Sequence, residues 1–479
     1  MQLILVAGFA VVLSVRQSPE ITGLFQAGWA RVVAAWAPAW LVVLAAGAIG
    51  VMVARRTEQP TRYPGAAQLW LGRGQVALRA ALLGLVIWTT WGAGWPRLVR
   101  HDWGMEDWVL VDEMLMLAPL LTAMVGCWAG MYPADQALRR QSLWHALADA
   151  RAPRPAWGLG GYLLFQVRHQ MLMIVAPLSL IVAGQDLLDR WRDPLFRWTG
   201  LYYTADLLLV VVAGAVFLIA PLMLRYIWST RPLPDGPLRE ALESIARRAR
   251  LRYRQILLWR SHGMIANAAV MGLAPPVRYV LLTDGLLEQM DRRQIEGVFG
   301  HEVGHVRLHH ITYYLIFAAG TALLTAAVLG AFERAWPGLL DLDYQQVLAL
   351  LMMGAMWVGV FGWLSRRFER QADVYGVGLL AAEIERARVV PGEPDPRVEA
   401  ADVFARALLT IAELNGINPA ARSWRHSSIA SRGAFVRRLA ACPADAVRFE
   451  QMLRRVRTGL LVATAILGVL CAWLYTPWG

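Results

Sequence analysis

Two histidines one helical turn apart are the residues in this sequence best suited to metal chemistry. They stand in the run Gly300-His301-Glu302-Val303-Gly304-His305. If residues 291–308 form one helix with Asp291 as its N-cap, His301 and His305 share one face of it. Two imidazoles at this spacing can bind one zinc ion, while Glu302 lies close enough to polarise a water on that ion. The motif H-E-x-x-H is short enough to arise by chance, so the alternative is two ordinary histidines on a helix.

A second pair of possible ligands follows about 65 residues later at the same helical spacing. Glu369 and Asp373 are four residues apart on an expected helix. A catalytic zinc needs a third protein ligand and an open position for water. One of these carboxylates can reach the metal, while the other accepts a hydrogen bond from a ligand histidine and fixes its tautomer. Both helices flank the same apolar hairpin on the same predicted side, so we expect the two pairs to meet in space.

The composition is that of a membrane protein. Of 479 residues, 57% are hydrophobic and only 17% are charged, and the formal net charge is +12. The basic residues are all arginine, which excludes Schiff-base and P-loop lysine chemistry. Arginines beside apolar segments indicate orientation signals and contacts with anionic lipid rather than a nucleic-acid partner. The single cysteines Cys127, Cys442 and Cys471 indicate neither a disulfide framework nor a thiolate metal site.

Nine apolar segments are candidates for membrane spans, because about 20 residues cross roughly 30 Å of hydrocarbon. The first is short, so eight spans are also possible, and it lacks the basic flank and cleavage site of a signal peptide. The candidates are residues 2–15, 32–53, 76–95, 109–130, 158–184, 205–228, 312–332, 345–365 and 458–477.

Arginines gather in alternate loops, after the second, fourth and eighth candidate spans. By the positive-inside rule, this distribution places the H-E-x-x-H side in the cytoplasm. We therefore expect an integral protein of a bacterial inner (cytoplasmic) membrane whose catalytic side faces the cytoplasm. The arginines concerned are Arg55, Arg56, Arg62, Arg73, Arg79, Arg139, Arg140, Arg151, Arg154, Arg366, Arg367 and Arg370.

The longest polar interval, residues 229–310, has the pattern of a small α+β domain. Proline and glycine separate it from the sixth span, and an amphipathic helix is expected from Pro237 to Arg250. An edge strand beside the motif helix would hold an extended peptide, because it offers unpaired N–H and C=O groups. The remaining expected elements are strands at Gln255–Trp259, Met264–Met271 and Val277–Thr283 and a short helix at Asp284–Gln289.

These motifs together resemble the HtpX and CAAX-prenyl-protease family of integral-membrane zinc endopeptidases. The resemblance covers about residues 229–440 and rests on four motifs in order along the chain. They are Asn267-Ala268-Ala269 in the family's substrate-side edge strand, H-E-x-x-H continuing to His310, the E-x-x-x-D of Glu369 and Asp373, and His426 followed six residues later by Arg432.

The resemblance implies a role for each matching residue. Zinc, one ion per chain, would be bound by His301, His305 and Glu369. Glu302 would be the general base, and Asp373 would support a ligand histidine. His426 and Arg432 would face the reacting carbonyl, although a purely structural role for His426 stays open. Substrate would lie along Asn267, Ala268 and Ala269, and Asn267 could instead only shape the strand.

The expected fold class is a mainly α polytopic membrane protein, with about nine transmembrane helices and a small α+β zincin-like metalloprotease domain. Two departures from the family stand out. Ser427 follows His426 where many relatives have proline, and residues 1–228 hold more spans than the shorter relatives. The expected domains are 1–228 (N-terminal spans), 229–310 (catalytic, first part), 311–366 (transmembrane hairpin), 367–457 (catalytic, second part) and 458–479 (C-terminal transmembrane helix).

The expected function is zinc-dependent hydrolysis of peptide bonds in membrane or membrane-associated proteins, in quality control or processing. The partners are then a protein or peptide substrate and the lipid bilayer. A protease that cleaves within the hydrocarbon is the less favoured enzyme, because charged residues flank the motif helix. The alternative that is not an enzyme is a membrane scaffold or binding protein with a degenerate protease domain. His309 and His310 are expected to be interfacial or packing side chains rather than ligands.

Overall fold

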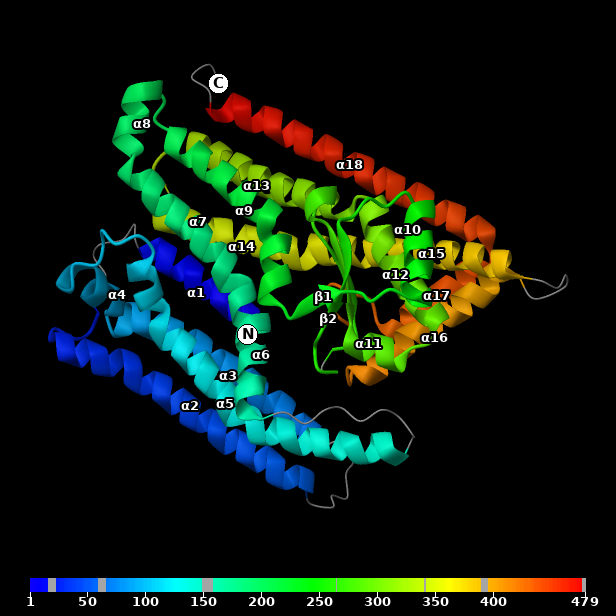
Figure 1. Cartoon of the computed structure of the whole chain (residues 1–479). Coiled ribbons are helices and arrows are strands. Elements are labelled where there is room, and N and C mark those ends of the chain that lie inside the picture. Colours follow the sequence, from blue (N-terminus) through cyan, green and yellow to red (C-terminus); the bar gives the residue numbers. More distant parts are fainter. Residues whose placement is uncertain are drawn as a thin grey trace. The chain divides into compact units, whose positions relative to one another are not determined.

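The computed structural model describes residues 1–15, 23–58, 66–148, 158–263, 265–339, 342–388 and 395–475. These residues are mainly helical and divide into two compact units, Met1–Ser229 and Thr230–Gly479 (Figure 1). Arg62, Arg151 and Arg154, three of the arginines behind the orientation prediction, lie outside the described residues. Met264 of the second predicted strand and residues 476–477 of the last predicted span lie outside them as well.

The first unit is built from apolar helices that share one core. Helices α2 and α5 pack along each other, and small residues bring their backbones together, because a Cβ added to Gly50 would lie 2.1 Å from the carbonyl oxygen of Gly130. The elements are α1 (Gln2–Val15), α2 (Gly28–Glu58), α3 (Ala66–Ile87), η1 (Trp88–Gly92), α4 (Trp95–Arg97), η2 (Leu98–Asp102), α5 (Val111–Ala148), α6 (Leu159–Gln166), η3 (Val167–Met171), α7 (Leu172–Arg190), α8 (Arg192–Thr199) and α9 (Thr204–Ile227).

Eight helical segments among the described residues are long and apolar enough to cross a membrane, and the chain is an integral membrane protein. Helix α1 has 14 residues, which span about 21 Å and fall short of the hydrocarbon thickness. The structure therefore supports eight of the nine predicted spans. The eight segments are Gly28–Thr57, Leu69–Gly92, Val111–Arg140, Leu159–Arg190, Thr204–Ile227, His310–Ala335, Val347–Ala387 and Pro443–Tyr475.

The second unit contains a four-stranded sheet in the order β1-β2-β4-β3. Strand β2 is parallel to β4, and the two outer pairings are antiparallel. The three predicted strands are present, β3 and β4 being shorter than expected. Strand β1 was missed, because Pro232 marked a turn, although proline is tolerated on an edge strand. The strands are β1 (Thr230–Pro232), β2 (Gln255–Trp259), β3 (Ala268–Met271) and β4 (Tyr279–Thr283).

Helices surround this sheet and continue into the membrane segments. Figure 1 shows α13 and α18 running side by side, in agreement with their contacts. Helix α15 carries on from α14 and η5 as one apolar-to-polar segment. The elements are α10 (Pro237–Arg248), η4 (Pro275–Val277), α11 (Asp284–Gln289), α12 (Arg292–Arg307), α13 (His310–Ala335), α14 (Leu342–Met356), η5 (Trp357–Phe361), α15 (Gly362–Ala387), α16 (Pro396–Leu414), α17 (Ile429–Ala441) and α18 (Pro443–Tyr475).

Helix α12 begins and ends where its sequence signals place it. The side chain of Asp291 accepts a hydrogen bond from the backbone N–H of Gln294 at 2.9 Å, and the backbone N–H of Asp291 donates one to Oε1 of Gln294. This capping box confirms the predicted N-cap. Buried Phe299 and Val303 pack into the core that the sheet and α10 share with α12. The opposite face of α12 is therefore left for the histidines.

Candidate metal centre

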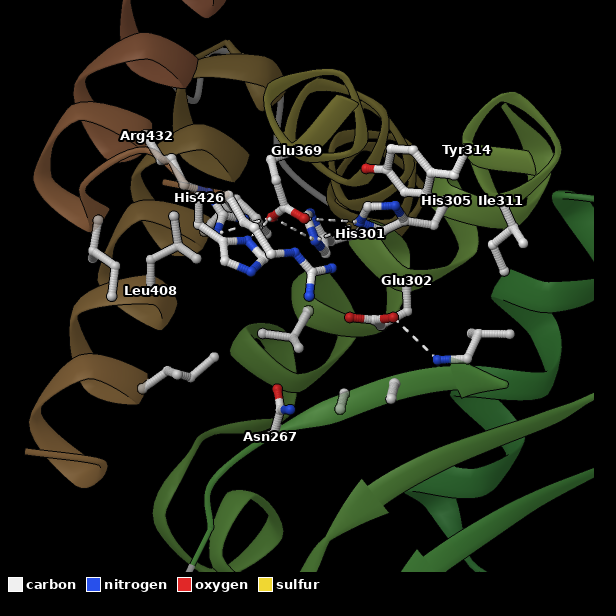
Figure 2. A pocket seen from close by; sticks show the side chains of 18 residues that line it. Asn267, His301, Glu302, His305, Ile311, Tyr314, Glu369, Leu408, His426 and Arg432 are labelled. Atoms are coloured by element: carbon white, nitrogen blue, oxygen red, sulfur yellow. Dashed lines mark hydrogen bonds and ion pairs between the residues drawn. The ribbon is translucent and has the colours of Figure 1, made fainter. Parts of the chain in front are cut away.

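Three ligand atoms from two helices converge in the second unit. His301 and His305 on α12 place their Nε2 atoms 3.2 Å apart. Glu369 on α15 lies 3.9 Å from His301 Nε2 and 3.7 Å from His305 Nε2, measured to its two carboxylate oxygens. Figure 2 shows the two imidazoles and this carboxylate pointing toward one another. Among the described residues, they form the one group of three such side chains close enough to share a metal ion.

Small residues allow the two helices to approach this closely. A Cβ added to Gly376 on α15 would lie 2.7 Å from the backbone nitrogen of His301, which is closer than real Cβ atoms come. A Cβ on Gly300 or Gly304 would lie 3.1 to 3.2 Å from the backbone of α15. Gly300 and Gly304 flank the histidines within the motif. The backbone contact between α12 and α15 thus carries Glu369 to the histidines.

Asp373 contacts the ring nitrogen of His301 that faces away from His305 and Glu369. Contact with a ligand histidine is one of the two roles expected for the acidic pair. Asp373 Oδ1 lies 2.8 Å from His301 Nδ1, on the side of the ring away from the metal-facing nitrogen. Burial opposes a charged imidazole, yet the contact with Asp373 raises the pKa of His301 above its ordinary value. The other carboxylate of the pair, Glu369, is thereby left to reach the metal.

Arg432 on α17 locks both carboxylates in place. Its Nε and Nη2 donate to the two oxygens of Asp373 at 2.8 and 2.6 Å, and Nη1 lies 3.3 Å from Glu369. Burial works against the charged guanidinium, but Asp373 and Glu369 raise its pKa above the ordinary value. His426 also contacts the site, with Nδ1 3.2 Å from Glu369 Oε2 and nearly half its side chain exposed. The catalytic roles of both residues stay predictions.

Glu302 stands apart from the three ligands and faces the edge strand. Its Oε2 accepts a hydrogen bond from the backbone N–H of Val270 at 3.1 Å, a contact drawn in Figure 2. Burial and the charge of Glu369 raise the pKa of Glu302 to about 7, although His301 and the Val270 amide act in the opposite direction. A carboxyl group with a pKa near neutrality can both accept and return a proton.

The donor set fits zinc. Two imidazole nitrogens and one carboxylate oxygen are ligands typical of catalytic zinc, whereas calcium and magnesium prefer oxygen alone. A tetrahedral ion with bonds near 2.0 Å separates its ligand atoms by about 3.3 Å, close to the distances between the two histidines and Glu369. Burial lowers the pKa of His305 to about 3, helped by the neighbouring His301. His305 is therefore neutral, as a metal ligand must be.

A cavity of about 420 Å³ opens beside the three ligands and extends along the edge strand. Figure 2 shows the Asn267 amide directed into it from the start of β3. The backbone carbonyl of Asn267 accepts a hydrogen bond from the backbone N–H of Thr283 on β4. Because hydrogen-bonded positions alternate along an antiparallel strand, the N–H and C=O groups of Ala268 and Val270 point away from β4, toward the open edge. The lining residues are Asn267, Ala268, Ala269, Val270, Val298, His301, Glu302, His305, Ile311, Tyr314, Glu369, Phe404, Leu408, Ile411, Arg425, His426, Ile429 and Arg432.

Sequence reasoning missed several residues of this site. Phe404 and Leu408 on α16 line the cavity, and Tyr314 on α13 does so from within an apolar segment. None belongs to a motif, so only three-dimensional packing identifies them. His310 was expected to be an interfacial or packing residue, but its Nδ1 lies 3.0 Å from Nδ1 of His305. Its neighbour His309 is exposed, as expected of an interfacial residue.

Comparison with known proteins connects this site to a family. The model of peptidase family M48 matches residues 232–390. A protease HtpX homologue of Aeropyrum pernix is 29% identical over 190 residues, which are 37% of this chain and 57% of the relative. The CAAX prenyl protease 1 homologue of Arabidopsis thaliana is 29% identical over 197 residues, or 38% and 45% of the two chains. The chain thus spans about half the length of these two relatives.

A third relative and one solved structure extend further. Protease HtpX of Pseudomonas aeruginosa is 24% identical over 258 residues, covering 48% of this chain and 84% of the relative. The crystal structure of S. mikatae Ste24p aligns with a TM-score of 0.49 at 15% sequence identity, over 85% of this chain and 98% of that one. The residues matched by the family model, 232–390, include His301, His305 and the acidic pair Glu369 and Asp373.

Proposed function

We propose that this integral membrane protein, whose residues 232–390 match the model of peptidase family M48, is a zinc-dependent endopeptidase that cleaves membrane or membrane-associated proteins. One observation carries the proposal. The Nε2 atoms of His301 and His305 and the carboxylate of Glu369 converge beside a cavity. A partly buried carboxyl group, Glu302, lines the same cavity without belonging to the ligand set. That combination is the minimum that zinc-assisted hydrolysis requires.

The residues of the chain divide the chemical work. When bound by His301, His305 and Glu369, zinc lowers the pKa of water toward about 7 and polarises the peptide carbonyl. Glu302 takes the proton of the attacking water and later gives it to the leaving amine. His426 stabilises the oxyanion of the tetrahedral intermediate, and Arg432 holds the surrounding groups in position.

The edge strand presents the substrate. An extended peptide adds to β3 through the outward backbone groups of Ala268 and the carbonyl of Val270, since the N–H of Val270 donates to Glu302. The Asn267 amide provides a further polar contact at the same edge. The apolar side chains of Phe404 and Leu408, which also line the cavity, accept an apolar side chain of the peptide. This arrangement favours unfolded or extended segments over folded protein.

The site lies next to the membrane segments. Helix α12 leads directly into the span His310–Ala335, and Glu369 is eight residues beyond Phe361 on the segment Val347–Ala387. Arg366, Arg367 and Arg370 flank Glu369, as expected on a cytoplasmic side. We infer that cleavage takes place at the cytoplasmic face of a bacterial inner membrane, in quality control or processing of membrane proteins.

Two measurements on purified full-length protein test the proposal. The wild-type chain should bind one equivalent of zinc and cleave an unfolded protein such as casein. A chelator should abolish cleavage, and added zinc should restore it. Glu302→Gln should retain the zinc and lose turnover by about 100- to 10,000-fold, the range for general base catalysis.

The opposite results would reject the assignment. A Glu302→Gln protein with wild-type turnover would show that Glu302 is not the base. Loss of zinc binding in the wild-type chain would favour a degenerate scaffold. Once the assignment holds, expression of Glu302→Gln in cells should trap the natural substrates for identification.

A further inference from the structure

His310 is a polar residue in a fully buried position, which the neighbouring sequence does not predict. It is the first residue of the apolar helix α13 and is fully buried. The turn between α12 and α13 is made by His309, whose φ of 56° lies in the left-handed region. That turn separates α12 from α13. It brings the His310 ring back to the far side of His305, with ring centroids 4.9 Å apart.

The contact between these two rings fixes where their protons lie. His305 Nε2 faces His301 and Glu369, so a metal at the site needs the lone pair of that nitrogen. The neutral ring then carries its proton on Nδ1, which lies 3.0 Å from Nδ1 of His310. Since only one proton can occupy the space between them, His310 Nδ1 is the acceptor. His310 must consequently carry its own proton on Nε2.

The Nε2 atom of His310 does have a partner that can accept this proton. This nitrogen lies 3.0 Å from Oε1 of Gln371 on α15. The orientation of that amide is set by two other groups, both on α18. Arg457, which can only donate, contacts Oε1, and Glu450 accepts from the amide nitrogen at 2.7 Å. Gln371 Oε1 is thus the acceptor for the Nε2 proton of His310, as the Nδ1 atom of His310 is the acceptor for His305.

We propose that His310, backed by Gln371 and Arg457, is a positioning residue that holds the Nε2 lone pair of His305 toward the metal. The inference rests on the metal site of the proposed function and assigns that site a second support. His301 is supported by the carboxylate of Asp373, whereas His305 is supported by the neutral ring of His310, which Gln371 and Arg457 hold in turn. This relay of contacts ends on α18, so the C-terminal membrane helix takes part in forming the metal centre.

A packing role for His310 predicts different behaviour. The ring stacks on Phe368 with centroids 4.4 Å apart and an interplanar angle of 3°. An apolar side chain of similar size would satisfy that contact but could not accept the proton of His305. Leucine and asparagine have nearly the same shape, and only asparagine places an acceptor where His310 Nδ1 lies. The pair His310→Leu and His310→Asn therefore separates the two roles.

The experiment measures zinc affinity of the purified full-length protein by competition with a chromogenic chelator. His310→Leu should weaken zinc binding by about 10- to 100-fold, the usual loss when the support of a ligand histidine is removed. His310→Asn should recover at least about tenfold of that loss. The visible spectrum of the cobalt-substituted protein should change in the leucine variant and stay close to wild type in the asparagine variant. His309→Asn, on the exposed neighbour and tolerant of its positive φ, should match wild type.

Three outcomes would overturn the proposal. Equal zinc affinities for the leucine and asparagine variants would assign His310 to packing. If His310→Leu fails to fold, Gln371→Met and Gln371→Glu repeat the comparison one link further out, since glutamate retains the acceptor and methionine does not. Equal affinities for that pair would likewise reject the relay. A wild-type chain without zinc would overturn the proposed function and this inference together, whereas zinc binding insensitive to His310 and Gln371 would overturn this inference alone.

Discussion

The backbone N–H of Val270 donates a hydrogen bond to Oε2 of Glu302 over 3.1 Å, from the open edge of β3. One residue pair thus connects the strand expected to hold the peptide with the expected base. This hydrogen bond orients the Glu302 carboxylate. It does not compete with the pairing of β3 and β4, because the residues on either side of Val270 make the hydrogen bonds to β4. The edge strand consequently positions two parts of the reaction at once.

Removing that donor should lower turnover while zinc stays bound. Val270→Pro deletes the N–H at a position where proline is compatible with an edge strand. Because a hydrogen bond to a charged group contributes about 1.5 to 3 kcal/mol, we expect kcat to fall roughly 10- to 100-fold. Val270→Ala keeps the N–H and serves as the control. Peptide hydrolysis and zinc content measured on both variants check this, and a proline variant with wild-type kcat contradicts it.

The raised pKa of Glu302 makes stability depend on pH. With a pKa of about 7 in the folded state against 4.5 unfolded, the folded chain binds more protons between these values. The contribution of Glu302 is therefore fully present below pH 4.5 and is lost as pH rises through 7. In chelator-treated protein, Glu302→Gln should gain up to about 3 kcal/mol relative to wild type over this window. Thermal unfolding of both proteins at pH 4.5 and 7.5 measures the difference, and parallel profiles would disprove it.

The close approach of α12 and α15 should tolerate no added methyl group. Gly376→Ala places a Cβ 2.7 Å from the His301 backbone nitrogen, so the helices must move apart and Glu369 retreats. We expect zinc affinity to fall at least about tenfold, by analogy with loss of a ligand's support. Gly378→Ala, two residues on and with nothing within 4 Å of its Cβ, should bind zinc normally. Equal affinities in the two variants would show that the contact is not required.

Breaking the buried pair between Asp373 and Arg432 should destabilise the fold. Asp373 is fully buried, so Asp373→Asn removes the charge that accepts two hydrogen bonds from the Arg432 guanidinium and leaves Arg432 only its longer contact with Glu369. The expected loss is about 3 to 5 kcal/mol in the free energy of unfolding. Asp402→Asn breaks the exposed pair with Arg437 and should cost about 1 kcal/mol or less. Chemical denaturation of both variants provides the comparison, and similar losses would refute the assignment.

The sequence predicted the local elements of the site well, because short-range chemistry determines them. The cap at Asp291 and the one-turn spacing of the histidines follow from helix geometry alone. The approach of Glu369 was predictable from the hairpin that separates the two motif helices. The spacing of the acidic pair left its two roles open, because it places both Glu369 and Asp373 on one face, and only the family resemblance implied that Glu369 is the ligand and Asp373 its support.

Contacts between distant parts of the chain were not predicted from the sequence. His310 was expected to be an interfacial or packing residue rather than a ligand, because zinc already has three protein ligands, and only the structure shows its contact with His305. The last span was predicted from residue 458, but α18 begins at Pro443. The first turns of α18 are polar and carry Glu450 and Arg457, the partners of Gln371. A search for apolar segments therefore does not detect this part of the helix. Helix α1 illustrates the reverse error, since an apolar segment need not be long enough to cross a bilayer.

The segment Val347–Ala387 joins lipid-facing residues and Glu369 in one continuous helix. A soluble fragment made by excising the hairpin would therefore detach the third ligand from its two histidines. In the intact protein, a bilayer thinner or thicker than the hairpin tilts this rod and displaces its polar end. We therefore expect the rate of peptide hydrolysis to depend on the acyl-chain length of the surrounding lipids, so that the thickness of the membrane helps to set the geometry of the site.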